Sequence, residues 1–364
     1  MEHGRSSIRE VMPAEALELM ARGARLVDVR DEPELLAGIA RGSIHVPRCE
    51  LVARVGQVAP DAAATLLIIC ASGVRSVQAA VQLTALGYSD VRSVAGGLAR
   101  WRREGLPVDS PSVPGDPDWE RYARQLALPE VGEAGQRRLM DARVLLVGAG
   151  GLGSPAALYL GAAGVGHLTL IDDDRVERSN LHRQVLHRDA SAGESKVRSG
   201  VATLRALNPS IEVVGHEVRL TEANARELLS GQNAVIDGSD NFMTRYVVND
   251  DCVALGIPYV HGSVFRFEGQ VSVFWPAWPG GAGPCYRCLY PEPPPPELAP
   301  SCAEAGVLGV VPGIIGLLQA AETLKLLLGA GVPLVGRMLH YDGLRGRFDE
   351  FAVPRDPRCP ACAH

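Results

Sequence analysis

The sequence predicts an α/β protein of two domains, and three observations lead to that expectation. Short apolar runs alternate with helical stretches along most of the 364 residues. A proline-rich segment interrupts the alternation, with prolines at positions 107, 111, 114 and 117. Such a segment holds neither a helix nor a central strand. At this length two domains can each bury a core. We expect a first domain over residues 1–107, a linker over 108–118 and a second domain over 119–364.

Composition narrows the class of protein. The chain is 46% hydrophobic and 21% charged, as is typical of globular proteins, and its net charge of −6 argues against general nucleic-acid binding. The first 20 residues lack the apolar core of a signal peptide. The most apolar segment, Ala305–Leu318, contains Pro312 and is too short to cross a membrane, so we expect a buried helix. We therefore expect a cytoplasmic protein whose cysteines are metal ligands or reactive thiols.

The first domain begins with alternating helices and strands. Residues 13–22 and 49–58 have helical patterns, and a turn-rich passage separates them. Leu26–Val29 and Thr65–Ile69 are apolar runs of strand length, and Val77–Leu86 is a further helix. The succession predicts a small α/β domain.

Cys70 directly follows the strand Thr65–Ile69, at the start of a loop that turns into a helix. Backbone N–H groups and the helix dipole at such a place lower the pKa of a thiol. Gly73 permits the tight turn, and Arg75 adds a positive charge for an anionic sulfur donor. The alternative is a small buried cysteine that ends a core strand.

Three segments place this domain in a known family. LVDVR, CASGVRS and SVAGGLARW occur in the order and spacing of a single-domain rhodanese, and residues 9–107 resemble that family throughout. The resemblance implies that Cys70 accepts a sulfane sulfur as a persulfide, which the loop amides and Arg75 surround. One departure is Gly38–Gly42, where the family usually has Gly-His-Ile-Pro-Gly.

The second domain contains a glycine-rich nucleotide motif. The apolar strand Val144–Val147 precedes the helix Ser154–Ala163, and a second strand, His167–Ile171, ends at Asp172. Between the first strand and the helix lie four glycines, Gly148, Gly150, Gly151 and Gly153. Glycines allow the backbone to approach a phosphate at the helix N-terminus, and a carboxylate at the next strand end binds ribose hydroxyls. The motif alone suits NAD as well as ATP.

The remaining elements continue the alternation. We expect a helical region from Trp119 to Met140, helices over 197–207, 222–229 and 242–255, strands over 211–215 and 234–237, and a hairpin over 264–275 that turns at 267–270.

Three features favour ATP. Arg183 and Lys196 are cations that follow the ribose-binding acid, as a triphosphate requires, and Asp240 follows a later strand, where it could hold Mg²⁺. No separate domain remains for hydride chemistry. The alternative is that both cations are solvated surface charges and that Asp240 only caps a helix.

Two C-x-x-C pairs and one further cysteine complete the candidate chemistry. Four thiolates satisfy a structural, tetrahedral Zn²⁺, and the ligands would be Cys285, Cys288, Cys359 and Cys362. Two redox pairs or unrelated thiols are the alternative. Cys302 follows the extended segment Tyr290–Pro300 and precedes an apolar helix, where a thiolate is plausible. Cys49 and Cys252 lie in helical contexts and are expected to pack.

The second domain as a whole resembles the MoeB/ThiF family, the ubiquitin-activating-type adenylyltransferases of small sulfur-carrier proteins. The segments that carry the resemblance are RYARQ, GAGGLGSP, DDDRVERSNLHRQ, GESK, DGSDN, CYRC, CAEAGVLG, PGIIGLLQAAETLK and CPAC. It implies a Rossmann-like ATP-binding adenylyltransferase domain with a structural zinc site. Asp172 would bind ribose, Gly151 would contact the nucleotide, and Asp240 would hold Mg²⁺. The phosphates would be bound by Asn180, Arg183 and Lys196, and the ATP site would also include Ser179, Leu181, His182 and Asn241. Arg124 would reach the phosphates of a neighbouring subunit, which implies a homodimer.

The two domains together suggest a sequence of steps. The second would adenylate the C-terminal glycine of a ubiquitin-like carrier ending in Gly-Gly, similar to ThiS or to the small subunit of molybdopterin synthase. The Cys70 persulfide, loaded from thiosulfate or a cysteine desulfurase, would then give a thiocarboxylate, directly or through Cys302. Two alternatives stay open, adenylation with an uncoupled rhodanese domain and a non-catalytic nucleotide-sensing scaffold. The pathway is equally open, whether molybdenum cofactor, thiamine or tRNA thiolation.

Overall fold

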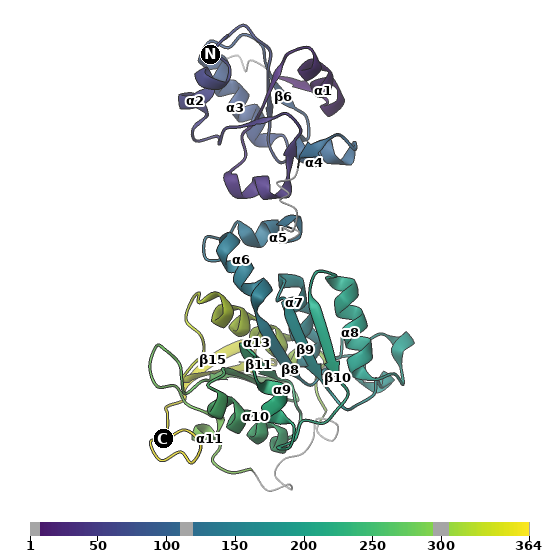
Figure 1. Ribbon diagram of the computed structural model, residues 1–364, viewed down its shortest axis with the longest axis vertical. Coiled ribbons are helices and arrows are strands. Elements are labelled where there is room, and N and C mark those ends of the chain that lie inside the picture. The colour runs from purple at the N-terminus through teal and green to yellow at the C-terminus, as the bar shows by residue number, and fades with distance from the viewer. Residues whose placement is uncertain (1–7, 110–118, 294–305, 364) are drawn as a thin grey trace. The chain divides into compact units, whose positions relative to one another are not determined.

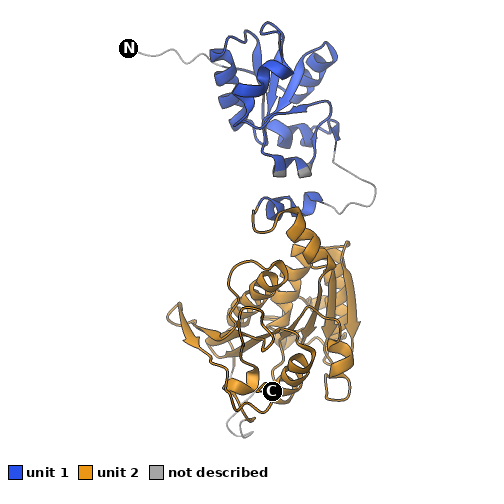
Figure 2. Cartoon of the chain, turned by 60° about the vertical axis from the view of Figure 1, so that its left-hand side comes forward, with its two compact units in different colours: residues 1–127 blue, residues 128–364 orange. Residues whose placement is uncertain are grey.

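The computed structural model describes residues 8–109, 119–293 and 306–363. It divides into two compact units, residues 1–127 and 128–364 (Figure 2). Helix α5 (Trp119–Leu126) belongs to the first unit, where it contacts the 3₁₀ helix η1 (Glu32–Ala37). The division into compact units follows α5, and the domain bounds expected from the sequence stay a prediction.

The first unit contains a five-stranded parallel sheet in the order β1-β6-β5-β2-β4. Its strands are β1 (Arg9–Val11), β2 (Arg25–Asp28), β4 (Ile44–His45), β5 (Leu66–Ile69) and β6 (Val91–Val94). The helices are α1 (Pro13–Ala21), α2 (Leu51–Val58), α3 (Val74–Ala85) and α4 (Gly97–Arg103), and β3 (Ile39–Ala40) pairs with β7 (Val108–Asp109). Alternate residues of β5 enter separate cores, because Leu66 and Ile68 pack with α2 and α3, and Leu67 and Ile69 with α1 and α4. The predicted α/β class is confirmed here.

Two sequence expectations for this unit need correction. Helix α3 begins at Val74 and not at Val77, because Gly73 takes a φ of 95° that turns the chain directly into the helix. Helix α2 begins at Leu51, and Cys49 lies exposed in the preceding turn, so the expectation that Cys49 packs was wrong.

The second unit is built on an eight-stranded sheet in the order β10-β9-β8-β11-β12-β13-β14-β15. The strands from β10 to β12 are parallel, and those from β12 to β15 are antiparallel. The strand bounds are β8 (Arg143–Val147), β9 (His167–Ile171), β10 (Glu212–His216), β11 (Ala234–Asp237), β12 (Tyr259–Phe265), β13 (Glu268–Phe274), β14 (Arg337–Asp342) and β15 (Arg347–Ala352).

Helices cover both faces of this sheet (Figure 1). One face packs against α7 (Gly153–Ala163), α8 (Lys196–Leu207) and α13 (Val310–Leu328). The other packs against α9 (Ala225–Leu229), α10 (Phe242–Leu255) and the short α11 (Tyr286–Leu289). Strand β8 shows the alternation, since Val144 and Leu146 face the first layer and Leu145 the second. The result is a doubly wound, Rossmann-like arrangement, as predicted.

Helix α13 is the one described helix that is long and apolar enough to cross a membrane, judged by length and composition alone. In the fold it contacts α7, β12 and β13, and Val311, Ile315 and Ala320 are buried in the core. It is thus the buried helix that the sequence indicated, although its described turns begin at Val310.

The helical region expected from Trp119 to Met140 contains two helices, α5 and α6 (Gly132–Asp141). Local turn chemistry moved two other boundaries. Helix α9 starts only at Ala225, because Asn224 Oδ1 accepts the backbone N–H of Thr221 at 2.8 Å and forms a turn there. The hairpin turns at Arg266–Phe267 and not at 267–270, and Arg266 takes the positive φ of 52° that this tight turn requires.

Candidate functional site

The candidate site is a cleft in the second unit, at the carboxyl edge of the parallel strands. The chain runs from β8 to β9 and β10 on one side and to β11 and β12 on the other, so the crevice opens between the loops that follow β8 and β11. Its volume is about 1170 Å³. The predicted residues that line it are Gly148, Gly150, Gly151, Asp172, Arg183, Lys196, Asp240 and Asn241.

Two glycines fix the loop at the floor of this cleft. Gly148 has a φ of 90°, and a side chain there would lie 2.9 Å from the Gly238 carbonyl oxygen of the loop after β11. At Gly153, the first residue of α7, an added Cβ would lie 1.9 Å from the Gly148 carbonyl oxygen. The loop therefore closes directly onto the helix N-terminus, an arrangement typical of phosphate binding.

Asp172 is anchored by the backbone at the end of β9. Its Oδ2 accepts the N–H of Ala149 and its Oδ1 accepts that of Asp174, both at 2.8 Å. Each carboxylate oxygen has a further lone pair, so the side chain can still accept ribose hydroxyls from the cleft.

Lys196 and Arg183 are not solvated surface charges. The Lys196 side chain is only 6% exposed, and its Nζ lies 2.7 Å from Asp174 Oδ2 and 3.9 Å from Asp172 Oδ1. Arg183 is partly buried and donates to Asn180 Oδ1 at 2.7 Å and to His182 Nε2 at 2.8 Å. Asn180 and His182 thus orient the guanidinium. Ser179 and Leu181 lie in the same turn, and the Ser179 hydroxyl donates to Glu177 at 3.3 Å.

Asp240 is exposed and lines the cleft, and the cap of α10 is its neighbour. Asn241 Oδ1 accepts the N–H of Thr244 at 3.0 Å, so the capping alternative applies to Asn241 and not to Asp240. In the described part of the chain, the carboxylates close enough to share a metal ion are Asp172, Asp173 and Asp174. Magnesium binding by Asp240 stays a prediction.

A buried polar group beside the cleft was missed in the sequence. Asp237 ends β11, and its carboxylate accepts the Tyr259 hydroxyl at 2.6 Å and the Ser239 N–H at 2.8 Å. His261 Nδ1 lies 3.5 Å from it. Burial raises the pKa of Asp237, but hydrogen bonding with His261 and the charge of Arg245 outweigh burial and hold the pKa below its ordinary value. The signal that could have found the group is Asp237 itself, an acid at the end of an apolar strand.

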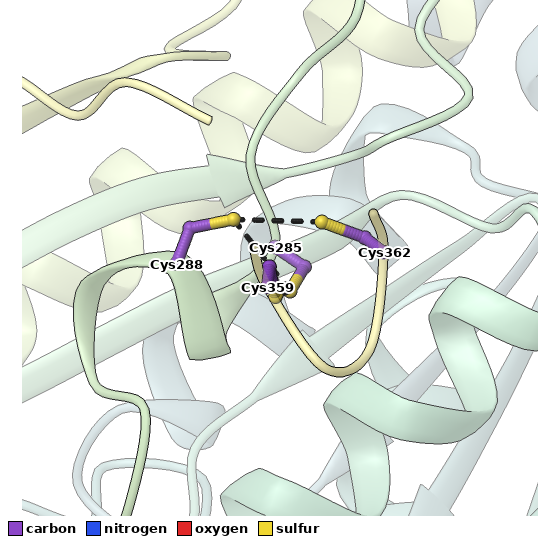
Figure 3. Close-up of side chains that lie close together, drawn as sticks. All are labelled: Cys285, Cys288, Cys359 and Cys362. Atoms are coloured by element: carbon purple, nitrogen blue, oxygen red, sulfur yellow. Dashed lines mark hydrogen bonds between the residues drawn. The ribbon is translucent and has the colours of Figure 1, made fainter. Parts of the chain in front are cut away.

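Four cysteines meet as predicted from the two C-x-x-C pairs (Figure 3). Cys285 Sγ lies 3.4 Å from Cys359 Sγ, Cys288 Sγ lies 3.4 Å from Cys362 Sγ, and the Sγ atoms of Cys285 and Cys288 are 4.0 Å apart. Sulfurs bound to tetrahedral zinc at about 2.3 Å are separated by about 3.8 Å, so the cluster fits that ion. Without a metal, burial raises the pKa of Cys285, and burial raises that of Cys362 to about 11.

In the first unit, Cys70 lies at the start of the loop that precedes α3 and is fully buried. Its Sγ accepts the N–H groups of Gly73 at 3.2 Å and Ser76 at 3.3 Å and lies 3.5 Å from Ser76 Oγ. Burial raises the pKa of the thiol, but the Ser76 hydroxyl and these amides together lower it below its usual value. This direction agrees with the acidic thiol that the sequence predicts, and a persulfide on Cys70 stays a prediction.

Arg75 is less free than the sequence suggested. Its guanidinium forms two 2.6 Å hydrogen bonds with the Glu34 carboxylate and lies 3.6 Å from Asp31. The charge that was assigned to an anionic sulfur donor is therefore already paired in this state.

Three further cysteine and arginine predictions have different outcomes. Cys252 is buried in the core, as expected, and burial raises its pKa well above the ordinary value. Arg124 is exposed on α5. Cys302 lies outside the described residues.

Comparison with known proteins agrees with this geometry. The ThiF family matches residues 122–361, and the rhodanese-like domain family matches residues 12–104. The sulfur carrier protein adenylyltransferase of Thermus thermophilus is 54% identical over 67% of this chain and 90% of its own length. The mouse adenylyltransferase and sulfurtransferase MOCS3 is 53% identical over 66% of this chain, a match that spans 52% of the mouse protein. A crystal structure of E. coli MccB with ATP shares the fold, with a TM-score of 0.58 at 22% identity over 66% of this chain and 74% of that one.

Proposed function

We propose, from the premise that this chain belongs to the ThiF family and carries a rhodanese-like domain, that it adenylates a ubiquitin-like sulfur carrier and then supplies its sulfur. The substrate is the C-terminal glycine of a carrier that ends in Gly-Gly, and the cosubstrate is ATP with Mg²⁺. Sulfur reaches Cys70 from thiosulfate or from the persulfide of a cysteine desulfurase. The product is a carrier with a C-terminal thiocarboxylate.

The observation that carries the proposal is the shared cleft. Asp172, Arg183, Lys196 and Asp240 come from separate segments of the chain and line one cavity at the end of the parallel sheet. A carboxylate reacts with ATP only when the repulsion between the two anions is overcome, which requires cations and close alignment at the α-phosphate. Arg183 and Lys196 supply the cations, and Asp240 would hold the Mg²⁺ that makes pyrophosphate a better leaving group. Zn²⁺ would be held by the four clustered cysteines and would tie the chain end to α11.

The sulfur step follows from the acidity of Cys70. The outer sulfur of its persulfide attacks the carbonyl carbon of the acyl adenylate, the C–O bond to AMP breaks, and an acyl disulfide forms. A second thiolate, for which Cys302 is the candidate, attacks the Cys70 sulfur and releases the thiocarboxylate. The disulfide that remains is reduced by a cellular thiol. These steps need reduced thiols, which is why we propose a cytoplasmic location and exchange with the thiol pool there.

Two assays test the proposal. Carrier-dependent ATP–pyrophosphate exchange measures adenylation, and its absence with every ubiquitin-like carrier tried would leave only the nucleotide-sensing scaffold. Intact mass spectrometry of the carrier, after incubation with enzyme, ATP and thiosulfate, measures replacement of oxygen by sulfur. If Cys70→Ala leaves the thiocarboxylate yield unchanged, adenylation and the rhodanese domain are uncoupled.

The assembly is part of the same proposal. We propose that Arg124, exposed on α5, completes the site of a second copy of the chain. Mixing Arg124→Ala with Lys196→Ala subunits should then restore part of the exchange activity that each variant lacks alone. A lack of restoration, with dimers shown by light scattering, would reject this arrangement.

A further inference from the structure

Arg245 is a second cationic site in the cleft, apart from the group around Lys196. It lies in the first turn of α10, lines the cavity, and stacks its guanidinium over the Phe242 ring at 5.0 Å. Its Nη2 donates to the Ser239 carbonyl oxygen over a long 3.4 Å. In the described ranges, no carboxylate forms a salt bridge with it, and Asp237, the acid whose field acts on it, accepts hydrogen bonds from Tyr259 and Ser239.

Two polar atoms at this position lack partners. Arg245 Nε and Ser239 Oγ are enclosed and have no hydrogen-bond partner among the described residues. An unpaired buried donor lowers the stability of the fold, and a buried charge without a salt bridge lowers it further. Burial lowers the pKa of Arg245, but Asp237, Tyr286 and Tyr259 together, including a hydrogen bond with Tyr286, raise it above its ordinary value, so the guanidinium stays charged. Arg245 also lines the cavity, where a charged guanidinium can bind an anionic ligand.

The surroundings separate this anion from the triphosphate. The groups that interact electrostatically with Arg245 are Asp237, Tyr259 and Tyr286, whereas Lys196 interacts with Asp172, Asp174 and His187. The two cations therefore have different neighbours within one cleft. Adenylation brings together two anions, and each needs its own cation to approach the other. The planar fork of arginine matches a carboxylate, which it can bind through two parallel hydrogen bonds.

We propose that Arg245 binds the substrate carboxylate and aims it at the α-phosphate, while Lys196 and Arg183 bind the nucleotide phosphates. This inference rests on the proposed function, because it names the residue that recognises the acid to be activated. It predicts that the enzyme distinguishes a free C-terminal carboxylate from an amide.

The variants are Arg245→Met, which keeps the length of the side chain, Arg245→Lys, which keeps the charge, and Arg198→Met as the control. Arg198 lies on α8 with 75% of its side chain exposed and does not line the cleft. Arg245→Met should lower kcat/KM for the carrier in pyrophosphate exchange about 100-fold, through KM. Its Kd for ATP, measured by calorimetry, should stay within about 3-fold of the wild-type value. Arg245→Lys should recover part of the loss, and Arg198→Met should behave as wild type.

A binding assay keeps this test separate from that of the proposed function. One carrier protein ending in Gly-Gly is prepared with a free carboxylate and with a C-terminal amide, and its affinity is measured with a non-hydrolysable ATP analogue present. The wild-type protein should prefer the carboxylate form, and Arg245→Met should lose the preference. If exchange fails but this Arg245-dependent preference is found, the inference stands and the proposed function falls. The inference is overturned if Arg245→Met keeps the preference, or if it weakens ATP binding as much as carrier binding. Arg245 then has a structural role or binds phosphate.

Discussion

Gly153→Ala is the sharpest test of the nucleotide loop, because one methyl group should damage the site without removing any charge. The added Cβ would lie 1.9 Å from the Gly148 carbonyl oxygen, whereas Cβ contacts below 3.0 Å are essentially never found. The difference, 3.0 minus 1.9, requires a shift of at least 1.1 Å. The partner atom is backbone, so the shift moves the glycine-rich loop itself.

The magnitudes follow from that displacement. Overpacking of this kind costs about 1–3 kcal/mol of folding free energy, and about 2–4 °C of Tm accompanies each kcal/mol in a unit of this size. A misplacement of about 1 Å at a reacting centre costs about 100-fold in rate. We therefore expect the Kd for ATP to rise at least about 10-fold and the exchange rate to fall about 100-fold. Calorimetric ATP titration and the exchange assay measure these two quantities.

Two matched glycines separate the causes. A Cβ at Gly166 would lie 1.6 Å from the Met140 carbonyl oxygen, a similar clash away from the cleft, so Gly166→Ala should lower Tm but leave the Kd for ATP unchanged. A Cβ at Gly313, inside α13, meets nothing within 4 Å, and Gly313→Ala should stabilise the protein by up to about 1 kcal/mol through helix propensity. Wild-type ATP affinity in folded Gly153→Ala would refute the reasoning about the loop.

Three further predictions concern the other groups. Lys196→Met should weaken ATP binding about 10- to 100-fold, because a charged hydrogen bond contributes about 1.5–3 kcal/mol, and an unchanged calorimetric Kd would contradict its assignment to phosphate. Cys288→Ser should lower the zinc content, measured by elemental mass spectrometry, and should lower Tm. Cys49→Ser, at an exposed cysteine, should change neither quantity. Equal zinc content in both variants would reject the site. Since the pKa of Cys70 lies below its ordinary value, its alkylation by iodoacetamide should fall only below that lowered pKa, and Ser76→Ala should shift the profile to higher pH and slow alkylation at neutral pH. Coincident profiles would show that the Ser76 hydroxyl does not acidify the thiol.

Local motifs predicted most of the strands and helices, and they located the glycine-rich loop, Cys70 and the cysteine pairs. The strand before Gly148, the strand that ends at Asp172 and the loop after Cys70 were located from the sequence because each joins an apolar run to turn residues and a helix. The cysteine pairs were found for the same reason, although the fold had to bring them together across 74 residues. Boundaries that depend on single side chains were missed. At Asn224, for example, the side chain forms a turn, so that α9 begins after it.

Pairing across segments could not be read from local patterns. Arg75 and Glu34 are 41 residues apart in the chain, and nothing in CASGVRS indicates that a carboxylate from η1 binds the arginine. The consequence is chemical, because a paired guanidinium attracts an anionic donor such as thiosulfate less than a free one. Loading of Cys70 from a small anion thus requires one of two conditions. Either the ion pair between Arg75 and Glu34 opens, or the loop amides attract the anion strongly enough without a free arginine.

The same reasoning explains why Arg245 escaped the sequence analysis and why it matters. An arginine in the first turn of a helix ordinarily faces solvent. Arg245 is instead partly buried, because α10 packs beside β11 and β12. This packing buries Asp237, Tyr259 and Tyr286 around it. Burying a charged arginine without a salt bridge lowers stability, and perturbed charges of this kind are found at functional sites. If Lys196 and Arg183 bind the phosphates, as proposed, the anion that Arg245 binds would be the second reactant. Three cations of one cavity are then divided between two roles, phosphate binding by Lys196 and Arg183 and carboxylate binding by Arg245. The affinity for ATP and the affinity for the carrier should then change independently when either group is altered.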